Sequence, residues 1–139
     1  MGAAMEQLII EATVENLAKV TEFIINSLEE MNCKPKIIMQ MELVIEELFV
    51  NVAHYAYRPD IGSCTVQKEI EENPRAIVIT FIDSGVPYNP LEHEDPDTSL
   101  GVEEREIGGL GIFLVKKNVD DISYEYKNGQ NVLRLKKLF

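Results

Sequence analysis

Residues 35–54 read PKIIMQMELVIEELFVNVAH, and this stretch carries the strongest structural signal in the chain. Apolar side chains recur along it at helical spacing, and they are Ile38, Met41, Ile45, Leu48 and Val52. The pattern predicts an amphipathic helix with this stripe in the core. Pro35 suits the opening turn of such a helix. The segment Arg58-Pro59-Asp60 predicts that the helix ends before it.

A polar stripe runs beside the apolar one on the same helix. Glu47, Asn51 and His54 have i, i+4, i+7 spacing and are therefore expected to share one helix face. A carboxylate, a carboxamide and an imidazole side by side can supply a general base, an oxygen ligand for Mg²⁺ and a donor to an anion. The polar flank of an ordinary amphipathic helix gives the same pattern, so both interpretations stay open at this point.

A strand and another helix are predicted upstream. Residues 8–12 form a short apolar segment typical of a strand, and Thr13 is placed to cap the helix that follows. The apolar positions of that helix are Val14, Leu17, Val20 (or Thr21), Ile24 and Leu28. The segment 32–35 ends in a proline and separates this helix from the next one.

Four strands and a short helix are predicted downstream. The strands are expected over residues 64–70, 76–82, 122–126 and 132–138. A turn at 72–74 joins the first two, and Asn128-Gly129 joins the last two as a strong hairpin signal. The short helix is expected over 112–119. The order β-α-α-β-β-loop-α-β-β predicts an α+β fold with one mixed, mostly antiparallel sheet and helices on one face.

Two glycine-containing segments lie at the ends of predicted elements. Asp83-Ser84-Gly85 ends an apolar strand, where an acid can accept a hydrogen bond from an exocyclic amine and a glycine permits close approach of a ligand. Gly108-Gly109-Leu110-Gly111 begins the short helix, whose free N–H groups and positive dipole end favour phosphate. An ordinary Asp-x-Gly turn and a glycine hinge are the respective alternatives. The spacing matches neither Gly-x-Gly-x-x-Gly nor the Walker pattern, which argues against a Rossmann fold and a P-loop.

The loop between these segments, residues 85–107, predicts neither helix nor strand. It holds seven acids, with Arg105 as its single Lys or Arg residue. Loops this long in a compact domain are usually functional or disordered.

Composition sets further bounds on the class of protein. The 139 residues contain 24 acidic and 13 basic side chains, and the pI near 4.6 argues against direct binding of nucleic acid. Cys33 and Cys64 form no Cys-x-x-Cys pair, which predicts free thiols in a reducing cytosol and a cytoplasmic protein. No apolar run approaches the ~18 residues of a membrane span, and no secretory leader is recognised. Residues 1–4 resemble a cloning remnant, and 5–139 are expected to form one domain.

Taken together, the acid/Asn helix, the Asp-x-Gly strand end, the long loop and the glycine-led helix resemble the GHKL ATPase superfamily. This group contains histidine kinases, type II topoisomerases, mismatch-repair ATPases and heat-shock chaperones. The sequence is most similar to its bacterial anti-sigma factor serine kinases. Glu47-Leu-Phe-Val-Asn51 resembles their Glu-x-x-x-Asn box, and Pro87 and Ile107 stand where histidine kinases usually carry glycines. The resemblance covers roughly residues 8–138 and implies a two-layer α/β sandwich of the Bergerat type with a long ATP lid.

The resemblance also implies roles for individual residues. Asn51 would hold Mg²⁺ at the phosphates of ATP, Glu47 would take the proton of a partner's serine hydroxyl, and Asp83 would bind the adenine amino group. The other nucleotide contacts fall on His54, Gly85, Pro87, Arg105, Gly108, Gly109, Leu110 and Gly111. These kinases commonly carry a histidine four residues after the Asn, where this chain has Tyr55. His54 matches instead the position of a basic side chain in histidine kinases. The loop 85–107 would be the ATP lid.

As a whole, the resemblance implies an ATP- and Mg²⁺-dependent serine kinase. It would phosphorylate an anti-sigma-factor antagonist and sequester a sigma factor, as a homodimer with no contact to nucleic acid or membrane. One alternative is a non-catalytic, ATP-sensing protein-binding module with the same fold. Another is an α/β scaffold without a nucleotide, whose glycines serve only turns. Glu47 and Asn51 together favour the kinase, because nucleotide binding alone would not need a base.

Overall fold

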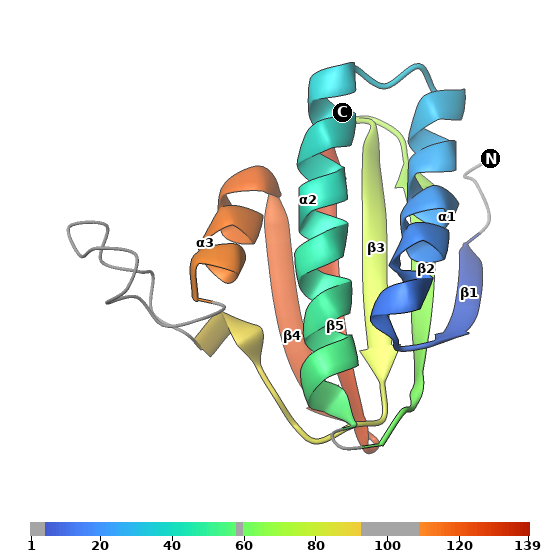
Figure 1. Cartoon of the computed structure of the whole chain (residues 1–139). Coiled ribbons are helices and arrows are strands. Elements are labelled where there is room, and N and C mark those ends of the chain that lie inside the picture. The colour runs from blue at the N-terminus through green and yellow to red at the C-terminus, as the bar shows by residue number, and fades with distance from the viewer. Residues whose placement is uncertain (1–4, 58–59, 93–108) are drawn as a thin grey trace.

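The computed structural model describes residues 5–57, 60–92 and 109–139. For residues 109 and 110 it describes the backbone and not the side chains. Within these ranges the chain forms two layers, in which helices cover one face of a five-stranded sheet (Figure 1). The elements are β1 (Glu6–Glu11), η1 (Val14–Asn16), α1 (Leu17–Glu30), α2 (Pro35–Asn51), η2 (Val52–Ala56), β2 (Ser63–Glu71), β3 (Ala76–Asp83), η3 (Pro90–Glu92), α3 (Gly109–Asn118), β4 (Asp121–Lys127) and β5 (Gln130–Leu138). The predicted order of elements and the α+β class are confirmed.

The sheet has the strand order β1-β2-β3-β5-β4. All four described strand pairs are antiparallel, which corrects the predicted mixed sheet to a fully antiparallel one in this part of the chain. The register places Asp83 opposite Cys64 on β2 and opposite Asn131 on β5. Asp83, Cys64 and Asn131 therefore lie side by side at the same end of three adjacent strands.

The core lies between the sheet and the helices. Its largest fully buried side chains are Phe49, Phe81, Ile24, Leu28, Met41, Ile45, Leu48, Ile77, Ile79, Leu135, Val20 and Val44. Cys33 and Cys64 are both buried and form no disulfide. Lys68 interrupts the apolar alternation of β2, and its buried Nζ donates to the Phe23 carbonyl oxygen at 2.5 Å and lies over the Phe23 ring. Among the described helices, none combines the length and apolar character of a membrane span.

Three local expectations need correction. The first strand covers Glu6–Glu11 instead of 8–12. Thr13 makes no capping hydrogen bond, because the 3₁₀ turn η1 delays the first α-helical turn to Leu17. The 3₁₀ turn η3 lies inside the segment expected to have no helix. Pro35, in contrast, opens α2 as expected.

The turn of the β4–β5 hairpin depends on two residues with positive φ. Asn128 and Gly129 both have positive φ, at 53° and 76°, as a type I′ turn requires. A Cβ on Gly129 would meet nothing within 4 Å, so only backbone strain opposes a side chain there. We expect Gly129→Ala to lower the free energy of unfolding by about 1 kcal/mol. Chemical denaturation measures this loss. Asn128→Gly is the control and should cost less, and an equal loss in both variants would contradict the explanation.

Candidate functional site

The end of α2 departs from regular α-helix where the predicted polar stripe lies. Residues Val52–Ala56 form a single π-helical turn, η2, which is wider than an α turn. Asn51 and Tyr55 both line the pocket beside it, whereas His54 is exposed and places its ring edge-on to Tyr55. His54 does not line this pocket. The predicted contact of His54 with the nucleotide stays a prediction. Single π turns occur frequently at functional sites.

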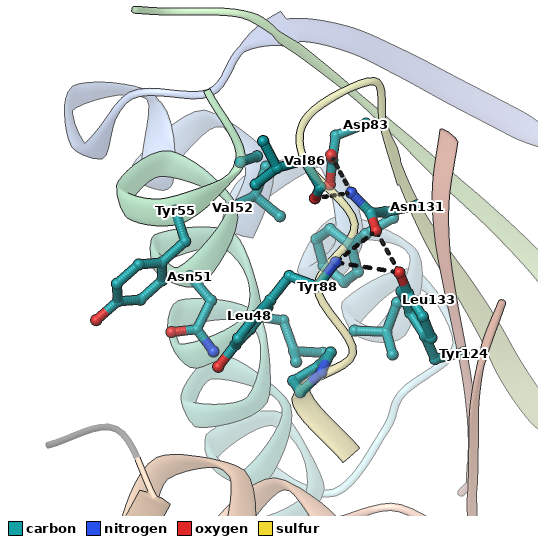
Figure 2. A pocket seen from close by; sticks show the side chains of 13 residues that line it. Leu48, Asn51, Val52, Tyr55, Asp83, Val86, Tyr88, Tyr124, Asn131 and Leu133 are labelled. Atoms are coloured by element: carbon teal, nitrogen blue, oxygen red, sulfur yellow. Dashed lines mark hydrogen bonds between the residues drawn. The ribbon is translucent and has the colours of Figure 1, made fainter. Parts of the chain in front are cut away.

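A pocket opens between α2 and the ends of the central strands (Figure 2). Residues from α2, η2, β3, the segment after β3, β4 and β5 line it. They are Leu48, Asn51, Val52, Tyr55, Ala56, Phe81, Asp83, Val86, Tyr88, Pro90, Tyr124, Asn131 and Leu133. The lining is mostly apolar, with few polar groups, as in small-molecule sites generally.

Asp83 supplies the carboxylate of this pocket and is only 6% exposed. Its Oδ1 accepts hydrogen bonds from the Gly85 backbone N–H and from Asn131 Nδ2, both at 2.9 Å. The described residues give its other oxygen no hydrogen bond or ion pair. Burial, with the Asp83 charge as the next cause, raises the pKa of the Cys64 thiol to about 12, so the thiol stays neutral. The free carboxylate oxygen is an acceptor that calls for a donor from a ligand.

Gly85 is required by the contact between this strand end and η2. A Cβ at position 85 would overlap the carbonyl group of Ala56, which is backbone and cannot rotate away. The same carbonyl oxygen accepts a hydrogen bond from Val86 N at 2.9 Å. The Tyr57 hydroxyl accepts from Ser84 N at 2.8 Å and donates to the Ser63 carbonyl oxygen at 2.6 Å. The Asp-x-Gly segment is thus an Asx-type turn held in place by η2 and the tyrosine that follows it.

Glu47 lies outside the pocket lining and against the first turn of α3. A Cβ on Gly111 would overlap the Glu47 carboxylate, so this glycine lets the acid approach the backbone of α3. The N-terminal turn of a helix carries free N–H groups and a partial positive charge, which favour an anion. Burial, and secondarily the charge of Glu46, raise the pKa of Glu47. A raised pKa makes its carboxylate a stronger base than an ordinary glutamate.

The remaining predicted residues are placed only in part. Pro87 is not among the residues that line the pocket and borders two shallow surface depressions instead. Gly109 and Leu110 begin α3. Arg105, Gly108 and residues 93–107 of the expected lid lie outside the described residues. No nucleotide role assigned to these residues is tested by the structure, and each stays a prediction.

The sequence analysis missed Asn131, which connects much of the site (Figure 2). Its Nδ2 donates to Asp83 Oδ1 at 2.9 Å and to the Val86 carbonyl oxygen at 2.8 Å. Its Oδ1 accepts from Tyr88 N at 3.1 Å and from the Tyr124 hydroxyl. The hairpin signal at 128–129 placed Asn131 near a strand start. Nothing in the sequence showed that this strand would pair with β3.

A family model described as the histidine kinase-like ATPase domain matches residues 10–137. The chain belongs to this family. The predicted resemblance to GHKL ATPases is therefore confirmed, together with the expected two-layer fold.

Curated relatives carry the name serine-protein kinase RsbW. The protein of Bacillus thuringiensis (strain Al Hakam) is 31% identical over 103 residues, which cover 71% of this chain and 63% of the relative. The protein of Bacillus cereus (strain AH187) is 28% identical over 132 residues, which cover 92% of this chain and 75% of the relative. The chain thus matches somewhat less than two thirds of the first relative's length.

A solved structure supports the fold independently of these sequence matches. The crystal structure of the RsbU and RsbW domains of a Mycobacterium tuberculosis protein superposes with a TM-score of 0.68 at 14% identity. The match covers 98% of this chain and 32% of that chain.

Gly85 and Gly111 form a matched pair for testing the site geometry. Gly85→Ala meets backbone, so we expect it to lower the free energy of unfolding by about 1–3 kcal/mol. Gly111→Ala meets the end of the flexible Glu47 side chain, and alanine favours the helix by about 1 kcal/mol. Its stability should therefore be unchanged or higher while Glu47 is displaced. Thermal unfolding compares the two variants, and equal destabilisation would contradict this geometry.

Proposed function

We propose that the chain is an ATP-dependent protein serine kinase that phosphorylates an anti-sigma-factor antagonist. The observation that carries the proposal is the presence of two carboxylates with different surroundings. Asp83 lies in a mostly apolar pocket with one oxygen left for a ligand, and Glu47 lies against the first turn of α3 with a raised pKa. The family match and the relatives named serine-protein kinase support this proposal.

The pocket side of the site fits an adenine base. Apolar side chains such as Leu48, Phe81 and Leu133 suit the faces of a flat ring. The free oxygen of Asp83 accepts a hydrogen bond, so it matches the exocyclic amine of adenine and repels the carbonyl oxygen of guanine. Gly85 keeps this wall of the pocket close to η2.

The phosphates would extend from the pocket toward Glu47 and the first turn of α3. Asn51 lines the pocket four residues after Glu47, and its carboxamide oxygen is a ligand of the type that Mg²⁺ prefers. The described residues contain no group of three His, Cys, Asp or Glu side chains able to hold a metal ion. Mg²⁺ is usually bound by one or two protein ligands together with substrate phosphates. When bound, Mg²⁺ would neutralise charge on the phosphates.

Glu47 would serve as the base in phosphoryl transfer. The serine Oγ of the partner protein forms a bond to the γ-phosphorus while its proton passes to a Glu47 carboxylate oxygen. The bond between the γ-phosphorus and the bridging oxygen breaks, and ADP leaves. Such transfer depends mainly on positioning and charge stabilisation, so one base, one metal ligand and one helix N-terminus can meet the need.

A non-catalytic, ATP-sensing binding module is the second candidate. One observation favours it, because Glu47 does not line the pocket with Asn51 and Asp83. Both candidates predict adenine nucleotide binding, and only the kinase requires the Glu47 carboxylate. The Glu47→Gln variant therefore separates them.

We also propose the finer features of the kinase interpretation. The chain would sequester a sigma factor, act as a homodimer in the bacterial cytoplasm and use residues 5–139 as one domain. Support comes from the resemblance to anti-sigma factor kinases and from the match over residues 10–137. Copurification of a sigma factor, with sedimentation to measure the oligomeric state, tests the first two features.

Glu47→Gln removes the base and keeps the shape of the side chain. We expect phosphoryl transfer to fall by about 10²–10⁴-fold while ATP affinity changes little. Transfer to a purified antagonist measures the rate, and calorimetry measures binding. Undiminished transfer would overturn the role of Glu47.

Glu46→Gln is the matched control, since Glu46 is exposed and its charge helps to raise the pKa of Glu47. A base works only when deprotonated, so wild-type transfer should decline as the pH falls through the raised pKa of Glu47. In Glu46→Gln this decline should move to lower pH, with the rate at neutral pH retained. An unshifted profile would show that Glu47 does not control the acid limb.

A further inference from the structure

We propose that Asn131 is the positioning residue that makes the site selective for a 6-aminopurine, because it fixes the Asp83 carboxylate in one orientation. The assignment rests on the proposed binding of ATP and deepens it. It comes from the hydrogen bonds of Asn131, which tie Asp83 to the segment that follows β3.

The hydrogen-bonding capacity of the Asn131 carboxamide is fully used. The side chain has two N–H donors and two acceptor lone pairs. The donors go to Asp83 Oδ1 and the Val86 carbonyl oxygen, and the acceptor takes Tyr88 N and the Tyr124 hydroxyl. Asn131 is only 6% exposed, so water has little access to replace any of these partners. A buried network satisfied in this way is rigid and costly to disturb.

These partners also determine which way the amide points. A flipped carboxamide would set its oxygen against the Asp83 carboxylate and the Val86 carbonyl oxygen, and its NH₂ group against the Tyr88 N–H. That arrangement places acceptors on acceptors and donors on donors. The orientation with Nδ2 toward Asp83 is therefore the one that the surroundings permit.

The consequence for Asp83 is that its two oxygens are no longer equivalent. Oδ1 accepts from both Asn131 Nδ2 and Gly85 N, and these two bonds prevent rotation of the carboxylate group. The second oxygen stays available to a ligand in the pocket that Asp83 lines. A fixed acceptor rejects a 6-oxo group, whereas a carboxylate free to rotate discriminates less.

Asn131 connects the same carboxylate to the backbone after β3. Val86 and Tyr88 both line the pocket, and both are held by the Asn131 carboxamide. The Asp83 carboxylate and this wall of the pocket therefore share Asn131 as a common hydrogen-bond partner. A substitution at Asn131 removes its bonds to Asp83 and to this wall together, while Tyr88 N keeps its bond to the Tyr124 hydroxyl at 3.2 Å and Val86 N keeps its bond to the Ala56 carbonyl oxygen at 2.9 Å. This separates the effect of Asn131 from that of a change at Asp83 alone.

The test compares ATP with inosine triphosphate, which carries a 6-oxo group and an N1 proton in place of the adenine pattern. We expect wild-type protein to bind ATP at least about tenfold more tightly than inosine triphosphate. In Asn131→Leu, which is similar in shape but has no polar atoms, this ratio should fall at least about fivefold. Asn131→Ser is measured in parallel, so that a folded variant is available if the leucine disrupts the site. Gln130→Leu, at the exposed neighbouring position on β5, is the control and should keep the wild-type ratio.

The ratio distinguishes positioning from a structural role. If the Asn131 variants weaken both nucleotides by the same factor, Asn131 supports only the fold and the proposal is overturned. A retained ratio in folded Asn131→Ser and Asn131→Leu overturns it as well. If wild-type protein binds neither nucleotide, the proposed function fails first and this assignment fails with it. A reduced ratio in the variants, with wild-type binding intact, supports both.

Discussion

The close contact between the turn after β3 and η2, which follows α2, is the constraint on which the site depends. Gly85 has no Cβ, so its backbone can rest on the carbonyl group of Ala56, and Val86 N donates to that same oxygen at 2.9 Å. The Tyr57 hydroxyl also accepts a hydrogen bond from Ser84 N at 2.8 Å. Because this turn cannot shift, the Asp83 carboxylate remains at the edge of an apolar pocket. Consecutive elements thereby position two parts of the site, α2 through its side chains and η2 through the backbone of Ala56.

The electrostatics of the site divide it into two parts. Around Asp83 the neighbouring acidic groups stay neutral, since burial raises the pKa of Cys64 to about 12 and that of Tyr124 above its ordinary value. The buried Asp83 carboxylate, with one oxygen that has no described partner, then favours a ligand that donates a hydrogen bond. Around Glu47, burial raises the pKa of the carboxylate beside the N-terminal end of α3. A raised pKa in the folded state means that the charged carboxylate costs stability at neutral pH, and functional sites commonly carry such a cost.

Local signals predicted the fold well and the site only in part. Periodicity located α1 and α2, and the positive-φ turn at Asn128-Gly129 located the hairpin, because these features depend on neighbouring residues. The π turn was not predicted, since no sequence rule signals it, and it alters the regular helical spacing between Asn51 and His54. Asn131 was missed because its role depends on the pairing of β5 with β3, a long-range choice that a single sequence does not show. The sequence singled out Asp83 and Gly85 because a strand end followed by glycine is itself a local pattern, and their roles at the nucleotide stay predictions.

Thermal unfolding of the purified protein with Mg²⁺ and ATP, ADP or GTP is the most direct test that this domain binds adenine nucleotides through Asp83. Selective binding to the folded state stabilises it by about 2.7 kcal/mol at a hundredfold excess of ligand over its dissociation constant. We expect ATP and ADP to raise the midpoint in the presence of Mg²⁺, GTP to raise it little, and Asp83→Asn to lose the response. An absent shift at millimolar ATP, or an equal shift with GTP and in the Asp83→Asn variant, would contradict the account.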